Sequence, residues 1–310
     1  MLADFHEADI RIQVNTNTDS RLGSVTFLRD AIRRRRPAIW HTHLTPVWAG
    51  VAAKTSFVSP WILTAHGFEP GLSFSAKLAR RAAYRGANHV VCVSEAVRHS
   101  VHRRYGVSPS KTSVIHPGID LERFSARGSH LAGDIPHMLF VGRLAPEKGL
   151  ETLFHALSEL LRPWRLTVVG DGPDRAALLR LAEMLGILPR VRFVGAVEDP
   201  SPFFREADLF CLPSHHEGQG MALLEAALSR VPAIASDLPA VREAFGEDGV
   251  MLVPAKDVDA WRQAIERVLN RYPEALVRAE AAERDVRDHY SLEEMVDKHA
   301  QLYRRFLRPV

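Results

Sequence analysis

Two carboxylates eight positions apart lie in the stretch PSHHEGQGMALLEAALSRVPAIAS. Glu217 follows an apolar strand-like run, and Glu225 lies inside the helix-like segment that comes next. Gly218 and Gly220 allow the backbone between them to turn sharply and to approach a ligand closely. A helix beginning near Met221 would present unpaired N–H groups and a positive dipole end, which favour phosphate. The pattern predicts a nucleotide diphosphate site, in which Glu225 accepts hydrogen bonds from ribose hydroxyls and Glu217 faces the terminal group.

A second stretch, FVGRLAPEKGLETL, carries two cations ahead of a predicted helix. Its strand ends at Gly142, and Arg143 and Lys148 follow in the loop. Two cations beside a helix N-terminus can neutralise a diphosphate. The alternative is that they form surface ion pairs with Glu147 and Glu151. The cationic and acidic stretches make one site only if their strands are neighbours in the sheet.

Short apolar runs alternate with amphipathic segments along the chain, which predicts strands alternating with helices. AIWHTHL, PWILTAHG and HVVCVSE are the strand-like runs of the first half; MLFVGRL, WRLTVVGDG, VRFVGAV, DLFCLPS and PAIAS are those of the second. Wholly apolar strands separated by helices indicate parallel sheets covered on both faces. The polar stretch SARGSHLAGDIPH separates the two series, so we expect an α/β protein with two doubly wound domains.

Composition excludes several classes of protein. The 310 residues are 46% apolar and 25% charged, as in a soluble globular protein. No apolar run approaches the ~18 residues of a membrane span, and the start lacks the pattern of a secretory signal. Cys92 and Cys211 each lie in an apolar run. They predict two buried free thiols in a reducing compartment, and hence a cytoplasmic protein.

Charge is unevenly distributed along the chain. Residues 1–130 carry 18 lysines and arginines against 9 acidic residues, whereas the remainder carries 22 against 28. The basic first half predicts an anionic partner, such as the inner face of a membrane. Solvated helix faces are the alternative. Nucleic acid is disfavoured because no aromatic residues are interleaved with the arginines.

The stretches GRLAPEKGLETL, VVGDGPDRAAL, VRFVGAV and PSHHEGQGMALLEAALSRVPAIAS, in this order, resemble the retaining glycosyltransferases of family 4. The resemblance continues in the first half through VCVSEAVRHSV and VIHPGIDLERF. It implies the GT-B fold, in which two Rossmann-like domains face a cleft. The expected divisions are an acceptor-side domain over 1–130, a nucleotide-sugar domain over 131–287, and a helix over 288–310 that crosses back to the first domain.

The resemblance also implies roles for particular residues. The donor nucleotide sugar would be bound by Gly142, Arg143, Lys148, Gly218, Gln219, Gly220, Met221 and Glu225. Glu217 and His66, the latter in the loop LTAHGF, would be the catalytic residues, with Glu217 orienting the sugar rather than attacking it. No metal or other cofactor is expected, because the basic pair and the helix dipole take its place.

The implied activity is transfer of a hexosyl group from a nucleotide-diphosphate sugar to an acceptor hydroxyl of a glycan or lipid-linked acceptor, with retention at the anomeric carbon. Two features depart from the family. No glycine-rich loop precedes IRIQVNTNT, so the first domain is expected to be incomplete, and Gln219 stands where the family often has an aromatic residue.

Other interpretations remain open. A catalytically impaired relative would bind nucleotide sugars without turnover, and a sugar-nucleotide epimerase shares the fold. A nicotinamide oxidoreductase would need G-x-G-x-x-G, and the nearest stretch, GDGPDR, lacks the third glycine. His41 and His43, spaced as HTH, could face a metal together or be structural.

Overall fold

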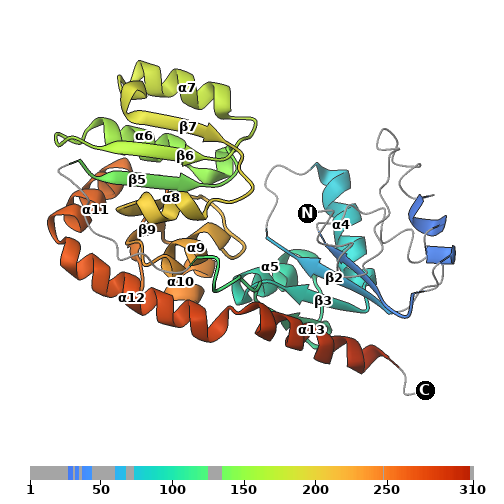
Figure 1. Cartoon of the computed structure of the whole chain (residues 1–310). Helices are drawn as coiled ribbons and strands as arrows, with labels where there is room; N and C mark the ends of the chain where they lie inside the picture. Colours follow the sequence, from blue (N-terminus) through green and yellow to red (C-terminus); the bar gives the residue numbers. More distant parts are fainter. Residues whose placement is uncertain are drawn as a thin grey trace.

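The computed structural model contains two parallel β-sheets with helices packed against them (Figure 1). It describes residues 27–30, 32–34, 37–43, 60–67, 73–124, 135–246 and 248–307. The segment PVWAGVAAKTS, whose apolar residues recur at helical spacing, lies outside these residues. So does the chain start, where the first domain was expected to be incomplete.

The first sheet has the order β1-β2-β3-β4, and every pair in it is parallel. Its strands are β1 (Trp40–His43), β2 (Trp61–Ala65), β3 (His89–Cys92) and β4 (Thr112–Val114). Helices α4 (Phe74–Gly86) and α5 (Glu95–Tyr105) connect β2 to β3 and β3 to β4. Alternate residues of β2 point to opposite faces, and both faces are buried. This is why its sequence is a continuous apolar run.

The second sheet has the order β10-β9-β8-β5-β6-β7, again with every pair parallel. Its strands are β5 (His137–Val141), β6 (Arg165–Val169), β7 (Val191–Gly195), β8 (Leu209–Leu212), β9 (Ala233–Ser236) and β10 (Met251–Val253). Its helices are α6 (Leu150–Ser158), α7 (Arg175–Met184), α8 (Ser201–Glu206), α9 (Met221–Leu228), α10 (Pro239–Phe245), α11 (Val258–Asn270) and α12 (Tyr272–His289). The chain leaves β5 toward β6 on one side and reaches β8 on the other, so the order reverses between β5 and β8.

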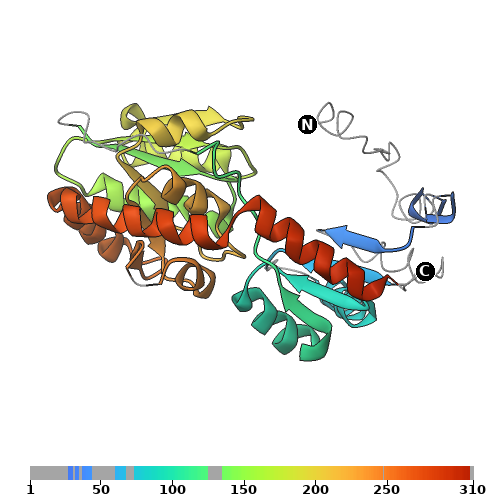
Figure 2. The same cartoon turned by 60° about the horizontal axis from the view of Figure 1, so that its bottom comes forward.

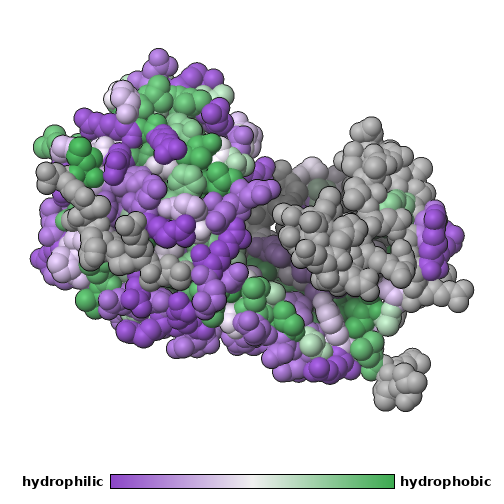
Figure 3. All heavy atoms as spheres, in the orientation of Figure 1, coloured by the Kyte–Doolittle hydropathy of each residue, from purple (hydrophilic) through white to green (hydrophobic). Residues whose placement is uncertain are grey.

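Separate hydrophobic cores cover the two faces of the second sheet. One includes Trp261 of α11 and Phe154 of α6, and the other includes Leu223 of α9 and Val286 of α12. Side chains on the outer surface of α12 are mostly hydrophilic in Figure 3. The sheet is therefore sandwiched between helices, as the apolar strands predict.

The last helix, α13 (Leu292–Phe306), leaves the second half and packs against the first sheet, as Figure 2 shows. Leu302 packs with Ile62, Val91 and Ile115, and Tyr303 lies against the same cluster. The domain boundaries at residues 130 and 287 stay predictions, but the expected α/β class with two Rossmann-like units is confirmed.

Both cysteines are free and buried, as predicted. They lie on different sheets, Cys92 in β3 and Cys211 in β8, and burial raises the pKa of each thiol, that of Cys92 to about 12. Among the described helices, none is both long enough and apolar enough to span a bilayer.

Candidate functional site

The cationic and acidic loops lie side by side because their strands are neighbours. Strands β5 and β8 pair in parallel, with Met138 opposite Leu209. The loop after β5 carries Lys148, and the loop after β8 carries Glu217, so both emerge from the same carboxyl edge. This edge lies where the strand order reverses, the position at which open α/β sheets bind ligands. The condition that the sequence left open is met.

Backbone contacts fix the two loops against each other. The His215 N–H donates to the Glu147 carbonyl at 2.7 Å. Gly149 has a left-handed φ of 66°, and a Cβ there would lie 2.0 Å from the Pro213 carbonyl oxygen. Only glycine satisfies both the conformation and the close approach.

The glycines of GDGPDR serve packing behind the site. A Cβ at Gly170 would lie 1.9 Å from the Gly142 carbonyl oxygen, and one at Gly172 would lie 2.3 Å from that of Leu144. The turn after β6 therefore presses directly against the loop after β5. This close packing accounts for the two glycines that the oxidoreductase alternative would have used.

A cavity of about 390 Å³ opens at this edge between the two halves of the molecule. Nine of the ten predicted site residues line it: His66, Gly142, Lys148, Glu217, Gly218, Gln219, Gly220, Met221 and Glu225. Val93 and Pro117 add surface from the first half. The tenth, Arg143, is exposed and is not among the lining residues. The structure thus groups the predicted set with one exception.

Lys148 and Glu217 form a direct ion pair at the cavity wall. The Lys148 Nζ donates to Glu217 Oε1 at 2.7 Å, and the Ser214 hydroxyl donates to the same oxygen at 2.7 Å. The Glu217 side chain is only 9% exposed. Lys148 therefore pairs with Glu217 rather than with Glu147 or Glu151, and any anion in the cavity would share its ammonium group with this carboxylate.

The N-terminus of α9 opens into the cavity. Its cap, Gly220, has a φ of 80°, a conformation that favours glycine. Leu223 and Leu224 both donate to the Gly220 carbonyl, but the amides of Met221 and Ala222 have no acceptor among the described residues. Free amides together with the helix dipole make this end a place for negative charge.

Glu225 lies one turn into α9 and is half-buried. Burial raises its pKa to about 7; the Arg123 guanidinium opposes this shift and the Asp199 carboxylate adds to it. Arg123 is itself paired with Asp199 at 3.0 Å, so its charge is largely compensated locally. Glu225 is thus a carboxyl group that is half-protonated near neutral pH and faces a cavity.

Gln219 turns its side chain into the protein instead of toward solvent, and it is 4% exposed. Neither carboxamide atom makes a well-formed hydrogen bond in the described part of the chain, although the group lies beside the Tyr290 hydroxyl. Burial raises the pKa of Tyr290 to about 12, partly offset by Gln219. A backbone role for this residue in the cavity is compatible with the buried side chain.

His66 reaches the cavity from the end of β2 and contacts the loop that carries Glu217 and Gly218. A Cβ at Gly218 would lie 1.9 Å from the His66 carbonyl oxygen, so the two backbones touch. The ring of His66 is held by His43, with His43 Nδ1 and His66 Nε2 3.0 Å apart. Burial and the neighbouring His43 lower the pKa of His66, which favours a neutral ring.

The HTH pair belongs to a hydrogen-bonded histidine cluster under α13. His41 lies 2.6 Å from the Tyr303 hydroxyl and 2.7 Å from that of Thr64. Burial first, and then the nearby histidines, lower the pKa of His41 to about 3. No group of three or more His, Cys, Asp or Glu side chains in the described ranges is arranged to hold a metal. The structural alternative for His41 and His43 fits these contacts.

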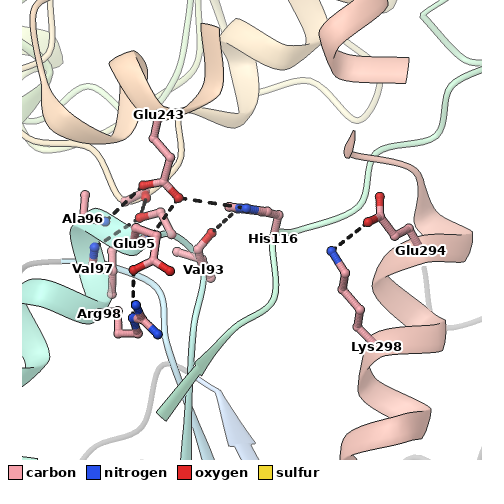
Figure 4. A network of polar contacts seen from close by, with 11 residues as sticks. Val93, Glu95, Ala96, Val97, Arg98, His116, Glu243, Glu294 and Lys298 are labelled. Atoms are coloured by element: carbon pink, nitrogen blue, oxygen red, sulfur yellow. Dashed lines mark hydrogen bonds and ion pairs between the residues drawn. The ribbon is translucent and has the colours of Figure 1, made fainter. Parts of the chain in front are cut away.

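The sequence patterns did not predict two sets of contacts between the halves, and Figure 4 shows those of Glu243. The Ser94 hydroxyl donates to the Gly218 carbonyl at 2.7 Å, and Glu243 of α10 accepts from the amides of Glu95 and Ala96 at 2.7 and 3.0 Å. The serine alone could have been recognised, as a helix N-cap in VCVSEAV. Its second partner lies 124 positions away, beyond any local pattern.

Together, the fold and the cavity define a GT-B protein, and comparison with protein families assigns its class. The family described as "Glycosyl transferases group 1" matches residues 135–271, and "Glycosyltransferase Family 4" matches residues 9–123. The two matches lie in successive parts of the chain, which belongs to the family 4 glycosyltransferases, as the resemblance implied.

Individual relatives are similar over most of the chain. TuaC of Bacillus subtilis, named for an expected glycosyltransferase role in teichuronic acid biosynthesis, is 31% identical over 80% of the chain. Glycogen synthase of Mycobacterium tuberculosis is 28% identical over 87%. D-inositol 3-phosphate glycosyltransferase of Mycolicibacterium smegmatis is 32% identical over 63%. The chain covers 65%, 69% and 48% of these relatives, respectively.

Solved structures share the fold at lower identity. HepE of Anabaena, in complex with UDP-glucose, superposes with a TM-score of 0.87 at 19% identity, covering 98% of this chain and 88% of HepE. Sucrose-phosphate synthase from Thermosynechococcus elongatus gives a TM-score of 0.83 at 22% identity, covering 96% of this chain and 80% of that one.

Proposed function

We propose that the protein is a retaining hexosyltransferase that moves a sugar from a nucleotide-diphosphate donor to a hydroxyl of a glycan or lipid-linked acceptor. The observation that carries the proposal is the cavity at the β5–β8 edge, which combines Lys148, the free amides of α9 and two carboxylates. HepE, with the same fold, was solved with UDP-glucose, which supports a nucleotide sugar as the donor.

The donor would lie with its diphosphate at the N-terminus of α9. Lys148 and the amides of Met221 and Ala222 would stabilise the charge that develops on the leaving diphosphate. These groups supply positive charge without a metal ion, which supports metal-independent transfer. Glu225, in its ionised form, would accept hydrogen bonds from the ribose hydroxyls.

Retention is supported by the environment of Glu217. One of its oxygens already accepts hydrogen bonds from Lys148 and Ser214, which suits a group that orients the sugar more than one that attacks it. The acceptor hydroxyl would then attack from the face of the departing diphosphate, and a diphosphate oxygen would take its proton. The neutral His66 would face the sugar from the first half.

A donor screen with UDP-, GDP- and ADP-sugars tests the proposal by thermal shift and by analysis of the transferred sugar. A recognised donor at 100 times its dissociation constant should stabilise the protein by about 2.7 kcal/mol. Lys148→Ala should lose half or more of this response. Lys298→Ala, which removes a lysine from an ion pair with Glu294 outside the cavity, is the matched control.

Three results separate the alternatives. A donor that binds and is transferred with its anomeric configuration unchanged supports the proposal. Binding with neither transfer nor hydrolysis of the sugar identifies the catalytically impaired relative. Interconversion of the free sugar nucleotide identifies an epimerase. No response to any nucleotide sugar contradicts the whole assignment.

An anionic membrane surface is the partner that fits helix α4. Its exposed stripe, spaced as one helical face, combines Phe74 and Leu78, 83% and 61% exposed, with the cations Lys77, Arg81 and Arg85. Basic side chains beside protruding apolar ones suit the interface of anionic lipids. Such docking would bring the acceptor side of the cleft to a lipid-linked acceptor at the inner face of the membrane.

Sedimentation with vesicles tests this surface. The protein should pellet with anionic vesicles at low salt and be released at high salt. Replacing Phe74 and Leu78 by serine should weaken pelleting, whereas the same change at Leu161 and Met184, 101% and 77% exposed on the second half, should not. Equal pelleting with neutral vesicles would contradict the electrostatic part.

A further inference from the structure

The N-terminus of α5 is docked on the other half of the molecule. Its first two amides, those of Glu95 and Ala96, donate to the Glu243 carboxylate of α10 at 2.7 and 3.0 Å (Figure 4). A carboxylate at this position satisfies amides that have no helical partner and interacts favourably with the helix dipole. The Glu243 side chain is only 18% exposed, so solvent screens the contact weakly.

Ser94 connects the same helix end to the loop that carries Glu217 and Gly218. Its hydroxyl oxygen accepts a hydrogen bond from the Val97 amide at 3.2 Å, which is the capping bond. The same hydroxyl donates a hydrogen bond to the Gly218 carbonyl at 2.7 Å. Ser94 has no exposed surface. Ser73 and Ser291 also cap helices, but in the described part of the chain neither side chain bonds to the loop that carries Glu217 and Gly218. An ordinary cap would not need the second bond.

The bond to Gly218 sets the direction of a cavity peptide. In a trans peptide the carbonyl and the following N–H point in opposite directions, so holding the Gly218 oxygen toward Ser94 turns the Gln219 N–H away from it. This N–H has no acceptor among the described residues, and Gln219 lines the cavity. The amide is therefore held in place and left available to a ligand.

We propose that Ser94 and Glu243 are positioning residues for the donor: docking of the α5 N-terminus on the second half orients the Gly218–Gln219 peptide toward the nucleotide sugar. The proposal rests on the proposed function of the cavity and adds to it the groups that hold its loop. Both contacts join the first half to the second, so both depend on the two halves being docked.

Matched serine variants test the first residue. Ser94→Ala and Ser291→Ala each remove one helix cap, but only the first removes the bond to the cavity loop. We expect a similar loss of thermal stability in both. We expect faster amide hydrogen exchange over residues 214–222, and a roughly 10-fold higher KM for the nucleotide sugar with a smaller change in kcat, only in Ser94→Ala. Ser94→Thr, which keeps the hydroxyl, should restore both.

Matched glutamate variants test the second residue. Glu243→Gln should weaken binding of the recognised nucleoside diphosphate, probed with UDP, GDP and ADP by calorimetry. Glu294→Gln changes a nearby carboxylate that pairs with Lys298 and not with α5, so it should leave binding unchanged. Small-angle scattering should show a more open molecule only for Glu243→Gln.

Hydrogen exchange needs no activity, so it separates this proposal from the proposed function. If no nucleotide binds the wild type, the proposed function fails, while exchange at residues 214–222 still decides whether Ser94 holds the loop. Unchanged exchange of this segment in Ser94→Ala overturns the proposal, as does an equal rise in KM in Ser291→Ala.

Discussion

Replacement of Glu225 by glutamine should stabilise the empty protein and abolish its response to nucleotide. The ordinary pKa of a glutamate is 4.5, and burial raises that of Glu225 to about 7. At ~1.36 kcal/mol per unit, this shift corresponds to about 3 kcal/mol of destabilisation when the carboxylate is ionised in the empty cavity. Glutamine removes the charge, so the variant should gain a stabilisation of this order above pH 7.

The dependence on pH has a definite sign. Because the folded-state pKa is raised, the folded protein binds more protons than the unfolded chain between pH 4.5 and about 7. The wild type therefore loses stability relative to Glu225→Gln as pH rises through this window. The gain from the substitution should be full at pH 8 and nearly absent at pH 4.5.

Thermal unfolding at pH 5 and pH 8, with and without the recognised nucleoside diphosphate, measures both effects. The variant should melt several degrees higher at pH 8 in the empty state and show no shift on adding nucleotide. Glu183→Gln, at an exposed position of α7, should match the wild type throughout. An unchanged or lower melting temperature for Glu225→Gln at pH 8 refutes the desolvation argument, and a preserved nucleotide response refutes the ribose role.

Three further changes follow from the contacts. Gly149 and Gly186 share a φ near 66°, but only at Gly149 would a Cβ lie 2.0 Å from the Pro213 carbonyl oxygen. In urea unfolding, Gly149→Ala should therefore lower the free energy of unfolding by more than ~2 kcal/mol, and Gly186→Ala by about 1 kcal/mol. The folded-state pKa of His41 is about 3, so below pH 6.5 protonation of this residue favours the unfolded chain. His41→Gln should therefore reduce the loss of stability on acidification by up to about 1.36 kcal/mol per pH unit. An unaltered slope of stability against pH contradicts this. Lys148→Ala should weaken nucleoside diphosphate binding, measured by calorimetry, by roughly 10- to 100-fold, and equal affinity would remove Lys148 from the site.

The sequence predicted most strands and helices because the strands are buried on both faces and so read as continuous apolar runs. The short strands β4 and β10 and the helices α5, α10 and α12 were not anticipated. Three residues are too few to show a period, which explains β4 and β10. The 18 residues of α12 bury a narrow, alanine-rich stripe that includes Ala275, Ala279 and Ala282, and its strongly charged remainder hides the pattern.

The candidate site was predictable where it depends on local spacing. The sequence shows glycine turns after strands, with acids and a lysine beside them, and nine of the ten predicted residues line one cavity. Arg143 was chosen for its charge and its place in the loop, and neither property determines the direction of its side chain. The strand order that brings Lys148 to Glu217 follows from pairing of β5 with β8, 71 positions apart at their paired residues, and local patterns do not encode it.

Gly218 shows how the loop that carries Glu217 contacts the first half of the molecule, which supplies only His66 to the predicted site. A Cβ at this position would overlap the His66 carbonyl oxygen at 1.9 Å, and the Gly218 carbonyl accepts from Ser94 at 2.7 Å. A side chain here would have to push the backbone at the end of β2 away. The absent side chain is therefore what lets the two halves meet, and their meeting fixes the peptide next to the cavity. If Ser94 positions this loop as proposed, donor affinity depends on both sheets, although nine of the ten predicted site residues come from the second.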